Sequence, residues 1–332
     1  MVTFLEELNG TLRGLLESRD DVVLFGEDLL DPYGGAFKVT QGLQRSFPQR
    51  VLTTPISEAA LVGLANGMAL RGLRPVVEIM FGDFLTLCVD QLVNHAAKFR
   101  GMYAGRVAVP VVVRTPMGGG RGYGPTHSQT LEKLLIGVPH LDVVAPSLFG
   151  GPAQPLLRAV AGDRPTLFVE HKLLYPAVLY AAGAGALHVE EVSDDGYRVA
   201  LVRNYASGTP DVTLITYGGV SRMLEVALTT LAGEEIRVLA CVPERLSPLP
   251  RQALAAAVLE SGRAVVAEEG TLSAGWGAEV AAAMQEAAWG ALRKPIRRVA
   301  ARDTIVPASR TLEAAVLPGP DDLVNAVVEI LE

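Results

Sequence analysis

The chain has 332 residues, and at about 100–200 residues per domain this length predicts two domains. Hydrophobic residues make up 49% of the chain and charged residues 20%, which is typical of a packed globular protein and excludes a disordered one. The 29 lysines and arginines against 36 aspartates and glutamates give a formal net charge of −7. Because the chain is acidic and has no basic run, we expect it to bind neither nucleic acid nor an anionic membrane surface.

The cysteines and the first residues bear on the cellular compartment. Cys88 and Cys241 are far apart, lie in apolar surroundings and are predicted to be small core residues, not a disulfide framework or a CxxC zinc site. The segment Met1–Glu7 is acidic, unlike a signal peptide, and no uncharged apolar run approaches the roughly 18 residues of a membrane span. We therefore expect a cytoplasmic protein.

Short apolar runs rich in Val, Ile and Leu recur through the first half of the chain. Continuous apolar runs of this kind are typical of strands buried on both faces, as in a parallel sheet. Helical stretches, 57–70 and 84–99, lie between them, and this alternation predicts βαβ crossovers and a doubly wound α/β domain. The predicted strands are Val22–Phe25, Val76–Met80, Val109–Val113, Val143–Ala145 and Thr166–Val169.

The alternation of predicted strands and helices stops after about residue 176 and resumes further along the chain. The segment 181–209 is rich in Ala, Gly and acidic residues and is predicted to connect two domains, 1–180 and 210–332, with a small hairpin as one option. In the second domain, helices are expected from about 221, 250 and 278 and over 321–331. The predicted strands are Val212–Thr216, Val238–Val242 and Ala264–Ala267.

The segment Thr53–Gly67 is the first candidate motif. Ser57 is a candidate N-cap, and Glu58 falls in the first helical turn, where the helix dipole favours a carboxylate. One interpretation gives Glu58 only this structural role. The other makes it a lone, partly desolvated acid in front of an apolar helix, suited to holding or relaying a proton. Gly63 and Gly67 would let a second helix approach closely, within the fold or across a subunit boundary.

The glycine-rich segment Met117–Gln129 is the second candidate motif. It follows the predicted strand 109–113, and ligands of open α/β sheets gather at the carboxyl ends of strands. It lacks the Gly-Lys-Ser/Thr ending of a phosphate-binding P-loop. His127 is predicted to be either a catalytic acid or substrate-binding donor, or a surface-loop histidine.

Two aromatic residues form the third candidate motif. Phe81 and Phe84 stand three apart where a predicted strand gives way to a helix. They either flank a flat heterocyclic ligand or belong to the core.

A series of short motifs runs in order through both predicted domains: Gly26–Asp28, Gly34–Thr40, Thr54–Glu58, Gly72–Pro75, Asp90–Asn94, His127–Gln129, Glu170–Lys172, Thr216–Gly218, Leu246–Leu249 and Gly275–Glu279. Together they resemble the β subunit of the thiamine-diphosphate-dependent 2-oxo acid dehydrogenases, the decarboxylase components for pyruvate and branched-chain 2-oxo acids, in the transketolase-like superfamily. The resemblance covers nearly the whole chain. It implies a transketolase-like pyrimidine-binding domain over 1–180 and a transketolase C-terminal-like domain over 210–332, both doubly wound.

The resemblance implies roles for five residues. Glu58 matches the glutamate that hydrogen-bonds N1′ of the cofactor's aminopyrimidine, a contact that favours the imino form able to remove the thiazolium C2 proton. Phe81 and Phe84 match aromatic residues packed against the pyrimidine ring. His127 matches the histidine that faces the substrate carbonyl or the acyl acceptor, and Glu27 matches an acid near the cofactor that serves a proton path.

The resemblance also implies partners. Thiamine diphosphate needs Mg²⁺, normally held at a Gly-Asp-Gly motif, and the chain contains no Gly-Asp-Gly. We therefore expect an α-type decarboxylase subunit to carry the Mg²⁺ and diphosphate site in an α2β2 assembly, and no metal ligand on this chain. The helix with Gly63 and Gly67 resembles the family's glycine-spaced subunit contact. The acyl acceptor would be the lipoyl domain of an acyltransferase.

Two other functions stay open at this point. One is a two-component transketolase-like enzyme that transfers a two-carbon unit to a sugar or a carrier protein in a specialised pathway. Gly124–His127 resembles single-chain transketolases, but Thr115 stands where those have a sugar-binding histidine. The other is a non-catalytic partner that only completes an interface, which would need neither Glu58 nor His127.

Overall fold

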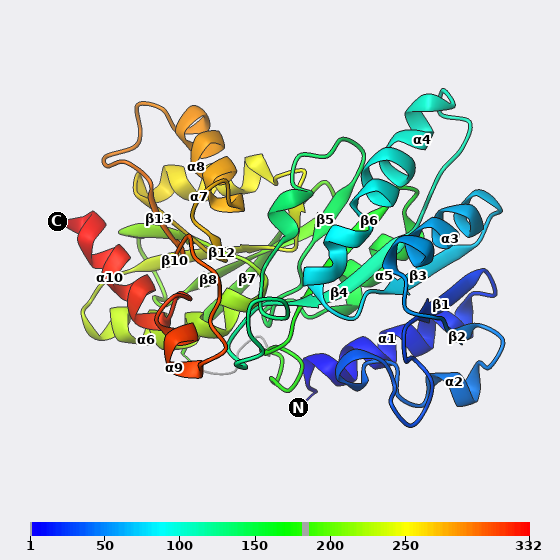
Figure 1. Cartoon of the computed structure of the whole chain (residues 1–332). Coiled ribbons are helices and arrows are strands. Elements are labelled where there is room, and N and C mark those ends of the chain that lie inside the picture. Colours follow the sequence, from blue (N-terminus) through cyan, green and yellow to red (C-terminus); the bar gives the residue numbers. More distant parts are fainter. Residues whose placement is uncertain (1, 181–185) are drawn as a thin grey trace.

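The computed structural model describes residues 2–180 and 186–332. They form two lobes, each built around a mostly parallel β-sheet, with the N-terminal half on the right and the C-terminal half on the left of Figure 1. Helices cover both faces of each sheet. The predicted pair of doubly wound α/β domains is confirmed.

In the described residues the first sheet has seven strands, in the order β11-β5-β6-β4-β3-β1-β2. The predicted apolar runs all form parallel strands, since each is buried on both sides. Sequence patterning missed β2, which is short and has two exposed residues. The strands are β1 (Val22–Gly26), β2 (Val51–Thr53), β3 (Arg74–Glu78), β4 (Val112–Met117), β5 (Asp142–Val144), β6 (Thr166–His171) and β11 (Arg245–Ser247).

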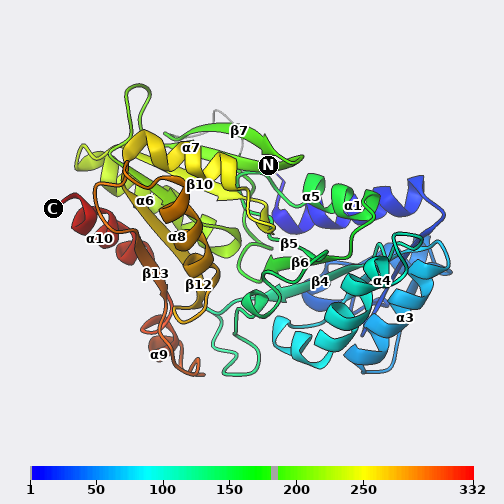
Figure 2. The ribbon, with the colours of Figure 1, turned by 90° about the horizontal axis from the view of Figure 1, so that it is seen from above.

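Two groups of helices sandwich this sheet, as Figure 2 shows. On one face lie α1 (Phe4–Ser18) and α5 (Ala153–Ala161), and on the other α3 (Glu58–Leu70) and α4 (Ala97–Met102). Short elements follow several strands. They are η1 (Ala36–Lys38), α2 (Leu43–Ser46), η2 (Gly82–Leu87), η3 (Gln91–Ala96) and η4 (Glu132–Leu134).

The single helix expected over 84–99 is wrong. The segment instead forms a 3₁₀ helix, η2, then a π-helical turn, η3, before α4 begins. Asn66 of α3 explains part of the irregularity, because its Nδ2 donates to the main-chain carbonyl of Gln91 over 2.8 Å. That carbonyl therefore has a partner outside its own helix.

The second sheet has six strands in the described residues, in the order β13-β12-β9-β10-β8-β7. Its strands are β7 (His188–Asp194), β8 (Tyr197–Arg203), β9 (Val212–Ile215), β10 (Val238–Pro243), β12 (Ala264–Thr271) and β13 (Arg297–Ala301). The helices are η5 (Gly218–Met223), α6 (Leu224–Gly233), α7 (Arg251–Ser261), α8 (Trp276–Ala287), α9 (Arg310–Ala314) and α10 (Pro320–Leu331). The predicted strands and helices of this domain are all present.

The segment predicted as a linker, 181–209, contributes to this second sheet. Strands β7 and β8 form an antiparallel hairpin, and β8 pairs with β10. The hairpin that the sequence left as an option is therefore long and belongs to the second sheet. Residues 181–185, also part of the predicted linker, lie outside the described residues.

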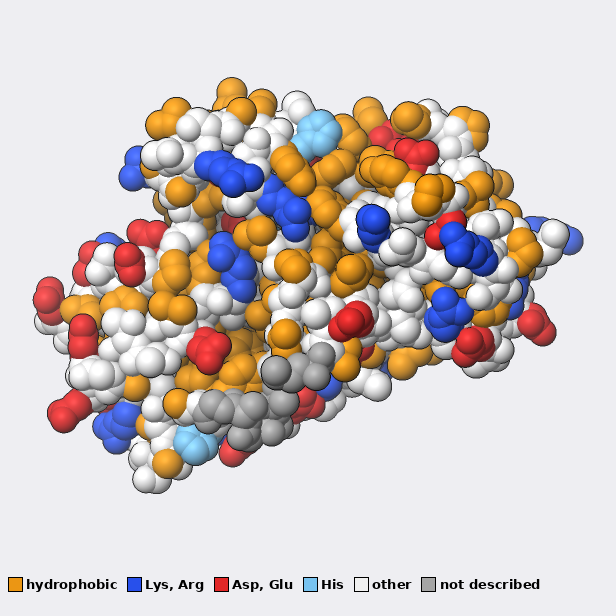
Figure 3. Space-filling model, turned by 90° about the horizontal axis from the view of Figure 1, so that it is seen from below, with side chains coloured by type: hydrophobic (Ala, Val, Ile, Leu, Met, Phe, Trp, Pro, Cys, Tyr) orange, Lys and Arg blue, Asp and Glu red, His pale blue; other side chains and the backbone are white. Residues whose placement is uncertain are grey.

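The two lobes are joined by a shared strand and a shared apolar core as well as by the connecting chain. Strand β11 follows β10 in sequence but pairs with β5 of the first sheet, and one apolar core runs from Val23 in β1 to Trp276 in α8. On the face shown in Figure 3, hydrophobic side chains are exposed on both lobes, with acidic and basic side chains interspersed. None of the helices in 2–180 and 186–332 combines the length and apolar character that a membrane span needs.

A buried acid lies where the lobes meet. Glu132 of η4 is fully buried, and one of its carboxylate oxygens accepts a hydrogen bond from the hydroxyl of Tyr217. Its other oxygen has no partner among the described residues. Burial, together with the nearby Glu268 and Glu269 carboxylates, raises the pKa of Glu132 to about 7. The domain interface therefore contains a group that titrates near neutral pH.

This acid makes the stability of the protein depend on pH. The folded-state pKa of Glu132, about 7, lies above its ordinary value of 4.5. The unfolded chain therefore loses this proton above about pH 4.5, whereas the folded protein keeps it up to about pH 7, and the contribution of the group to stability is lost over this range. We expect Glu132→Gln to gain a few degrees of Tm relative to the parent as the pH rises from about 5 to about 7.5. The control is Glu329→Gln, an exposed acid. A Tm difference that stays constant over this range would contradict the assignment.

Candidate active site

The predicted site residues lie at one edge of the first sheet, where the carboxyl ends of its parallel strands meet. Glu27 directly follows β1, and Phe81 and Phe84 follow β3. The glycine-rich segment that ends in His127 begins as β4 ends, and Glu58 is the first residue of α3, soon after β2. Such an edge is where open α/β sheets bind ligands.

Glu27 and Glu58 form a pair of buried acids. Their side chains belong to residues that are only 4% and 6% exposed. Burial raises the pKa of Glu27, the neighbouring Glu58 carboxylate raises it further, and the main-chain N–H of Ser57 opposes the rise. One oxygen of Glu27, Oε1, has no hydrogen-bond partner among the described residues. The pair can therefore hold a proton and has an acceptor free for a ligand.

Ser57 takes the N-cap position of α3, as predicted, but its side chain makes no capping hydrogen bond. Its main chain is directed instead at Glu27, on the preceding strand–loop junction. Glu58 in turn lies near Cys88, the residue directly after η2, and burial together with the Glu58 carboxylate raises the pKa of Cys88 to about 12. Cys88 and Cys241 are both buried free thiols, as predicted.

Phe81, Phe84 and His127 form an aromatic cluster. The His127 ring lies edge-on to both phenylalanines, with ring centroids 4.7 Å from Phe81 and 5.4 Å from Phe84. All three side chains are half-buried, and Phe84 packs on the main apolar core. The cluster thus presents aromatic surface at the edge of the core. It is connected to the acid pair through η2, which runs from Gly82, next to Phe81, to Leu87, next to Cys88.

Lys172 holds the His127 segment in place. Its ammonium donates to the main-chain carbonyl of His127 and lies 5.3 Å from the centroid of the Phe81 ring. The residue is fully buried, and this burial lowers the pKa of Lys172 to about 8, against the opposing effect of nearby Asp83. Asp83 also accepts a hydrogen bond of 2.8 Å from the Gln129 side chain. Sequence reasoning assigned Lys172 no role, although a lysine directly after a wholly buried strand was a signal.

A buried ion network lies beneath the site. Arg114 of β4 makes a bidentate pair with Glu170 of β6, at 2.8 and 2.6 Å, and also pairs with Glu78 of β3. Glu78 in turn accepts the main-chain N–H of Ala36 over 2.6 Å. All three charged residues are essentially unexposed. Sequence reasoning missed this network, whose only signal was charged residues inside apolar strands.

The glycine-spaced face of α3 is largely open among the described residues. A Cβ added at Gly67 would meet nothing within 4 Å, and one at Gly63 would meet only the Gln91 side chain, at 3.8 Å. Leu64, on the same helix, is 54% exposed. The close helix approach that these glycines would permit therefore does not occur within the described fold.

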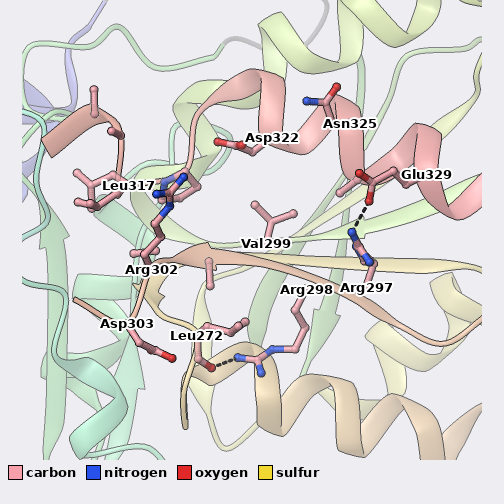
Figure 4. A pocket seen from close by; sticks show the side chains of 17 residues that line it. Leu272, Arg297, Arg298, Val299, Arg302, Asp303, Leu317, Asp322, Asn325 and Glu329 are labelled. Carbon is pink, nitrogen blue, oxygen red and sulfur yellow. Dashed lines mark hydrogen bonds and ion pairs between the residues drawn. The ribbon is translucent and has the colours of Figure 1, made fainter. Parts of the chain in front are cut away.

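A large hollow in the described residues does not coincide with the predicted site. It measures about 720 Å³ and lies between β13 and α10, where Arg297 and Glu329 form an ion pair across it (Figure 4). A second hollow of about 660 Å³ lies between the segment after His127 and the second lobe. Neither is lined by Glu58, Phe81 or Phe84, so volume alone does not locate the chemistry.

Comparison with known proteins identifies both lobes. Residues 1–178 match the family model "Transketolase, pyrimidine binding domain", and residues 204–323 match "Transketolase, C-terminal domain". A solved structure described as a split gene transketolase, inactive beta4 tetramer, superposes with a TM-score of 0.76 over 100% of this chain and 99% of that one, at 19% identity. This likeness confirms the fold.

Similar sequences extend over the full chain. The pyruvate dehydrogenase E1 component subunit beta of Staphylococcus epidermidis is 35% identical over 100% of this chain and 99% of the relative. The 3-methyl-2-oxobutanoate dehydrogenase subunit beta of Mycobacterium tuberculosis is 37% identical over 99% and 92%. The acetoin:2,6-dichlorophenolindophenol oxidoreductase subunit beta of Cupriavidus necator is 36% identical over 92% and 90%. The chain therefore belongs to the family of 2-oxo acid dehydrogenase E1 β subunits, within the transketolase-like superfamily.

Proposed function

We propose that this chain is the β subunit of a thiamine-diphosphate-dependent 2-oxo acid dehydrogenase. With an α-type subunit, it decarboxylates a 2-oxo acid and passes the acyl group to a lipoyl domain. The observation that carries the proposal is that the buried Glu27–Glu58 pair and the aromatic cluster with His127 lie at the same edge of the first sheet. Relatives at 35–37% identity over nearly their whole length, named as dehydrogenase β subunits, support it.

The residues present fit the pyrimidine half of thiamine diphosphate. A flat, nitrogen-rich ring needs an aromatic surface to pack on and a buried carboxyl to bond a ring nitrogen, and the site offers Phe81 and Phe84 for the first and Glu58 for the second. The unpartnered Oε1 of buried Glu27 is an acceptor that a bound group would satisfy. When bound there, the cofactor would supply the nucleophilic carbon and the electron-accepting ring that decarboxylation of a 2-oxo acid needs.

The chain's own residues then have separate tasks. Glu58 holds a proton against N1′ of the pyrimidine, and burial keeps water from competing for that contact. Glu27, whose pKa is raised by burial, exchanges protons with Glu58. Phe81 and Phe84 orient the ring and exclude water. His127, held by Lys172 through its main chain, presents its imidazole as a proton donor to the substrate carbonyl or the acyl acceptor.

The Mg²⁺ and diphosphate site belongs, in this proposal, to the α-type partner. The sequence contains no Gly-Asp-Gly motif, and the relatives are named as β subunits. The face of α3 with Gly63 and Gly67 is exposed and nearly free of contacts from the described residues, and it offers a surface for a closely packed subunit.

The transketolase-like alternative has less support. Thr115, at the position where single-chain transketolases have a sugar-binding histidine, is fully buried within β4. The hydroxyl at that position is therefore not exposed to a sugar substrate.

Removing the acid function of Glu58 tests the central assignment. We expect Glu58→Gln, co-expressed with the α-type chain, to assemble normally and to slow exchange of the thiazolium C2 proton by about 10²-fold or more, because the amide cannot share the proton. Exchange is followed by NMR in deuterated buffer. Glu225→Gln is the matched control, since Glu225 also lies in the first turn of a helix but is exposed. Exchange as fast in Glu58→Gln as in the parent would refute the role.

The division of the cofactor site between two chains gives a second test. We expect this chain alone to bind thiamine diphosphate and Mg²⁺ weakly in calorimetric titration, and the complex with the α-type chain to bind them tightly. Gly67→Leu should leave the chain folded, because a Cβ there meets nothing, but weaken the assembly by overpacking the partner contact. Gly14→Leu, an equally open glycine of α1, is the control. Micromolar, Mg²⁺-dependent binding by the isolated chain would overturn the two-subunit proposal.

A further inference from the structure

The glycine-rich segment before His127 is held by carboxylates of the second domain. The main-chain N–H of Gly119 donates to Glu269 Oε1 over 2.7 Å. The N–H groups of Gly120 and Gly122 donate to the two oxygens of Glu313, over 2.9 and 2.8 Å. Glu269 lies on β12 and Glu313 on α9, so these contacts join parts of the chain that are 150 or more residues apart.

The glycines are required by this geometry. Gly118, Gly120 and Gly122 have φ values of 90°, 84° and 72°, a region that other residues rarely adopt. A Cβ at Gly119 would stand 2.4 Å from Leu317 Cδ1 and 3.0 Å from Glu313 Oε1. Alternating positive φ lets successive N–H groups converge on one anion. In this chain that anion is the Glu313 carboxylate. The anion-binding position formed by these N–H groups is therefore already occupied by a side chain of the protein itself.

Glu313 is well suited to fix the segment. It is 1% exposed, and each of its oxygens accepts one main-chain N–H. Charge-assisted hydrogen bonds of this kind are stronger than those between neutral groups. The neighbouring contact, from Gly119 to Glu269, also involves a charged carboxylate, because Glu269 pairs with His171 at 2.9 Å. Burial favours a raised pKa for Glu269, but the His171 partner outweighs it and lowers the pKa of Glu269 to about 2.

The held segment leads directly to His127. The His127 N–H donates to the Gly124 carbonyl over 3.3 Å, and Arg121 donates to the main-chain carbonyl of Lys172 over 3.1 Å. Lys172 itself donates to the main-chain carbonyl of His127. The backbone from Gly119 to His127 is thus fixed at one end by the second domain and at the other by the first.

We infer that Glu313 is a positioning residue for His127: by binding the N–H groups of Gly120 and Gly122, the second domain sets the place of the imidazole and controls the steps that use it. The inference rests on the proposed function for the role of His127. It assigns the C-terminal domain a part in the reaction, besides its part in the fold.

The contact itself is tested on the isolated chain. In Glu313→Gln, the side-chain amide turns one acceptor into a donor facing a glycine N–H, so we expect amide hydrogen exchange in a peptide covering 118–126 to accelerate at least about tenfold. Exchange is measured by mass spectrometry. Glu329→Gln, an exposed acid on α10, is the control and should leave this peptide unchanged. Unchanged exchange in Glu313→Gln would overturn the inference.

The consequence for the reaction is tested in the complex with the α-type chain. We expect Glu313→Gln to slow acyl transfer to a lipoyl domain about tenfold, while the exchange of the C2 proton stays at the parent rate. In a His127→Ala background, the same substitution should slow acyl transfer no further. Additive losses in this double-mutant cycle, or a parallel loss of C2 exchange, would mean that Glu313 serves only folding.

Two further outcomes are distinguishable. If Glu313→Gln does not assemble, Glu313→Asp keeps the charge but shortens the reach. We then expect an intermediate loss of transfer and partial loss of protection, and parental values for both would overturn the inference. If His127→Ala alone turns over normally, the role of His127 in the proposed function is wrong, whatever the exchange data show for the Glu313 contact.

Discussion

The site depends on one buried cation, the guanidinium of Arg114. It joins three adjacent strands, because it lies on β4 and pairs with Glu78 on β3 and Glu170 on β6. Glu78 extends the link to the loop after β1 through the N–H of Ala36. Breaking a buried pair of this kind typically costs about 3–5 kcal/mol, because the remaining carboxylates are left uncompensated. The edge of the sheet from which all site segments depart is thereby held in a fixed arrangement.

On this base the chain assembles three kinds of group with different chemistry. The acid pair, Glu27 and Glu58, is buried and able to retain a proton. The phenylalanines supply a flat apolar surface, and His127 stands against them on a segment whose backbone is bound by charged groups from both domains. The two charged side chains that bind this backbone, Lys172 and Glu313, are both buried. Preorganisation of this kind is what a proton-transfer site requires.

Much of the fold could be predicted from the sequence, and the exceptions have physical causes. The strands β1 and β4 were predictable because both of their faces are buried, which leaves an unbroken apolar run. The hairpin of β7 and β8 was less visible, since β7 is largely exposed and carries polar residues. The break between η2 and α4 is explained in part by a hydrogen bond from Asn66 to Gln91, which no local pattern contains.

For the site, local sequence patterns indicated candidate residues but did not decide between their possible roles. They marked Glu58, His127 and the phenylalanines as candidates, each with a functional and a structural interpretation, and only the resemblance to a family favoured the functional one. Glu313 could not be found in this way, because its partners are glycines that lie more than 190 residues earlier in the chain. Glycines at positive φ show only that the backbone turns there, and the group that the turn binds is visible only in the fold.

Strand β11 has a consequence for how this protein can be divided. It leaves the second domain, completes the first sheet next to β5, and returns. A fragment that ended near residue 180 would keep the whole pyrimidine side of the site but expose β5 as an unpaired edge, and such edges invite pairing with other chains. The two lobes therefore have separate sheets, but the first sheet is complete only with β11, a strand that the second half of the chain supplies.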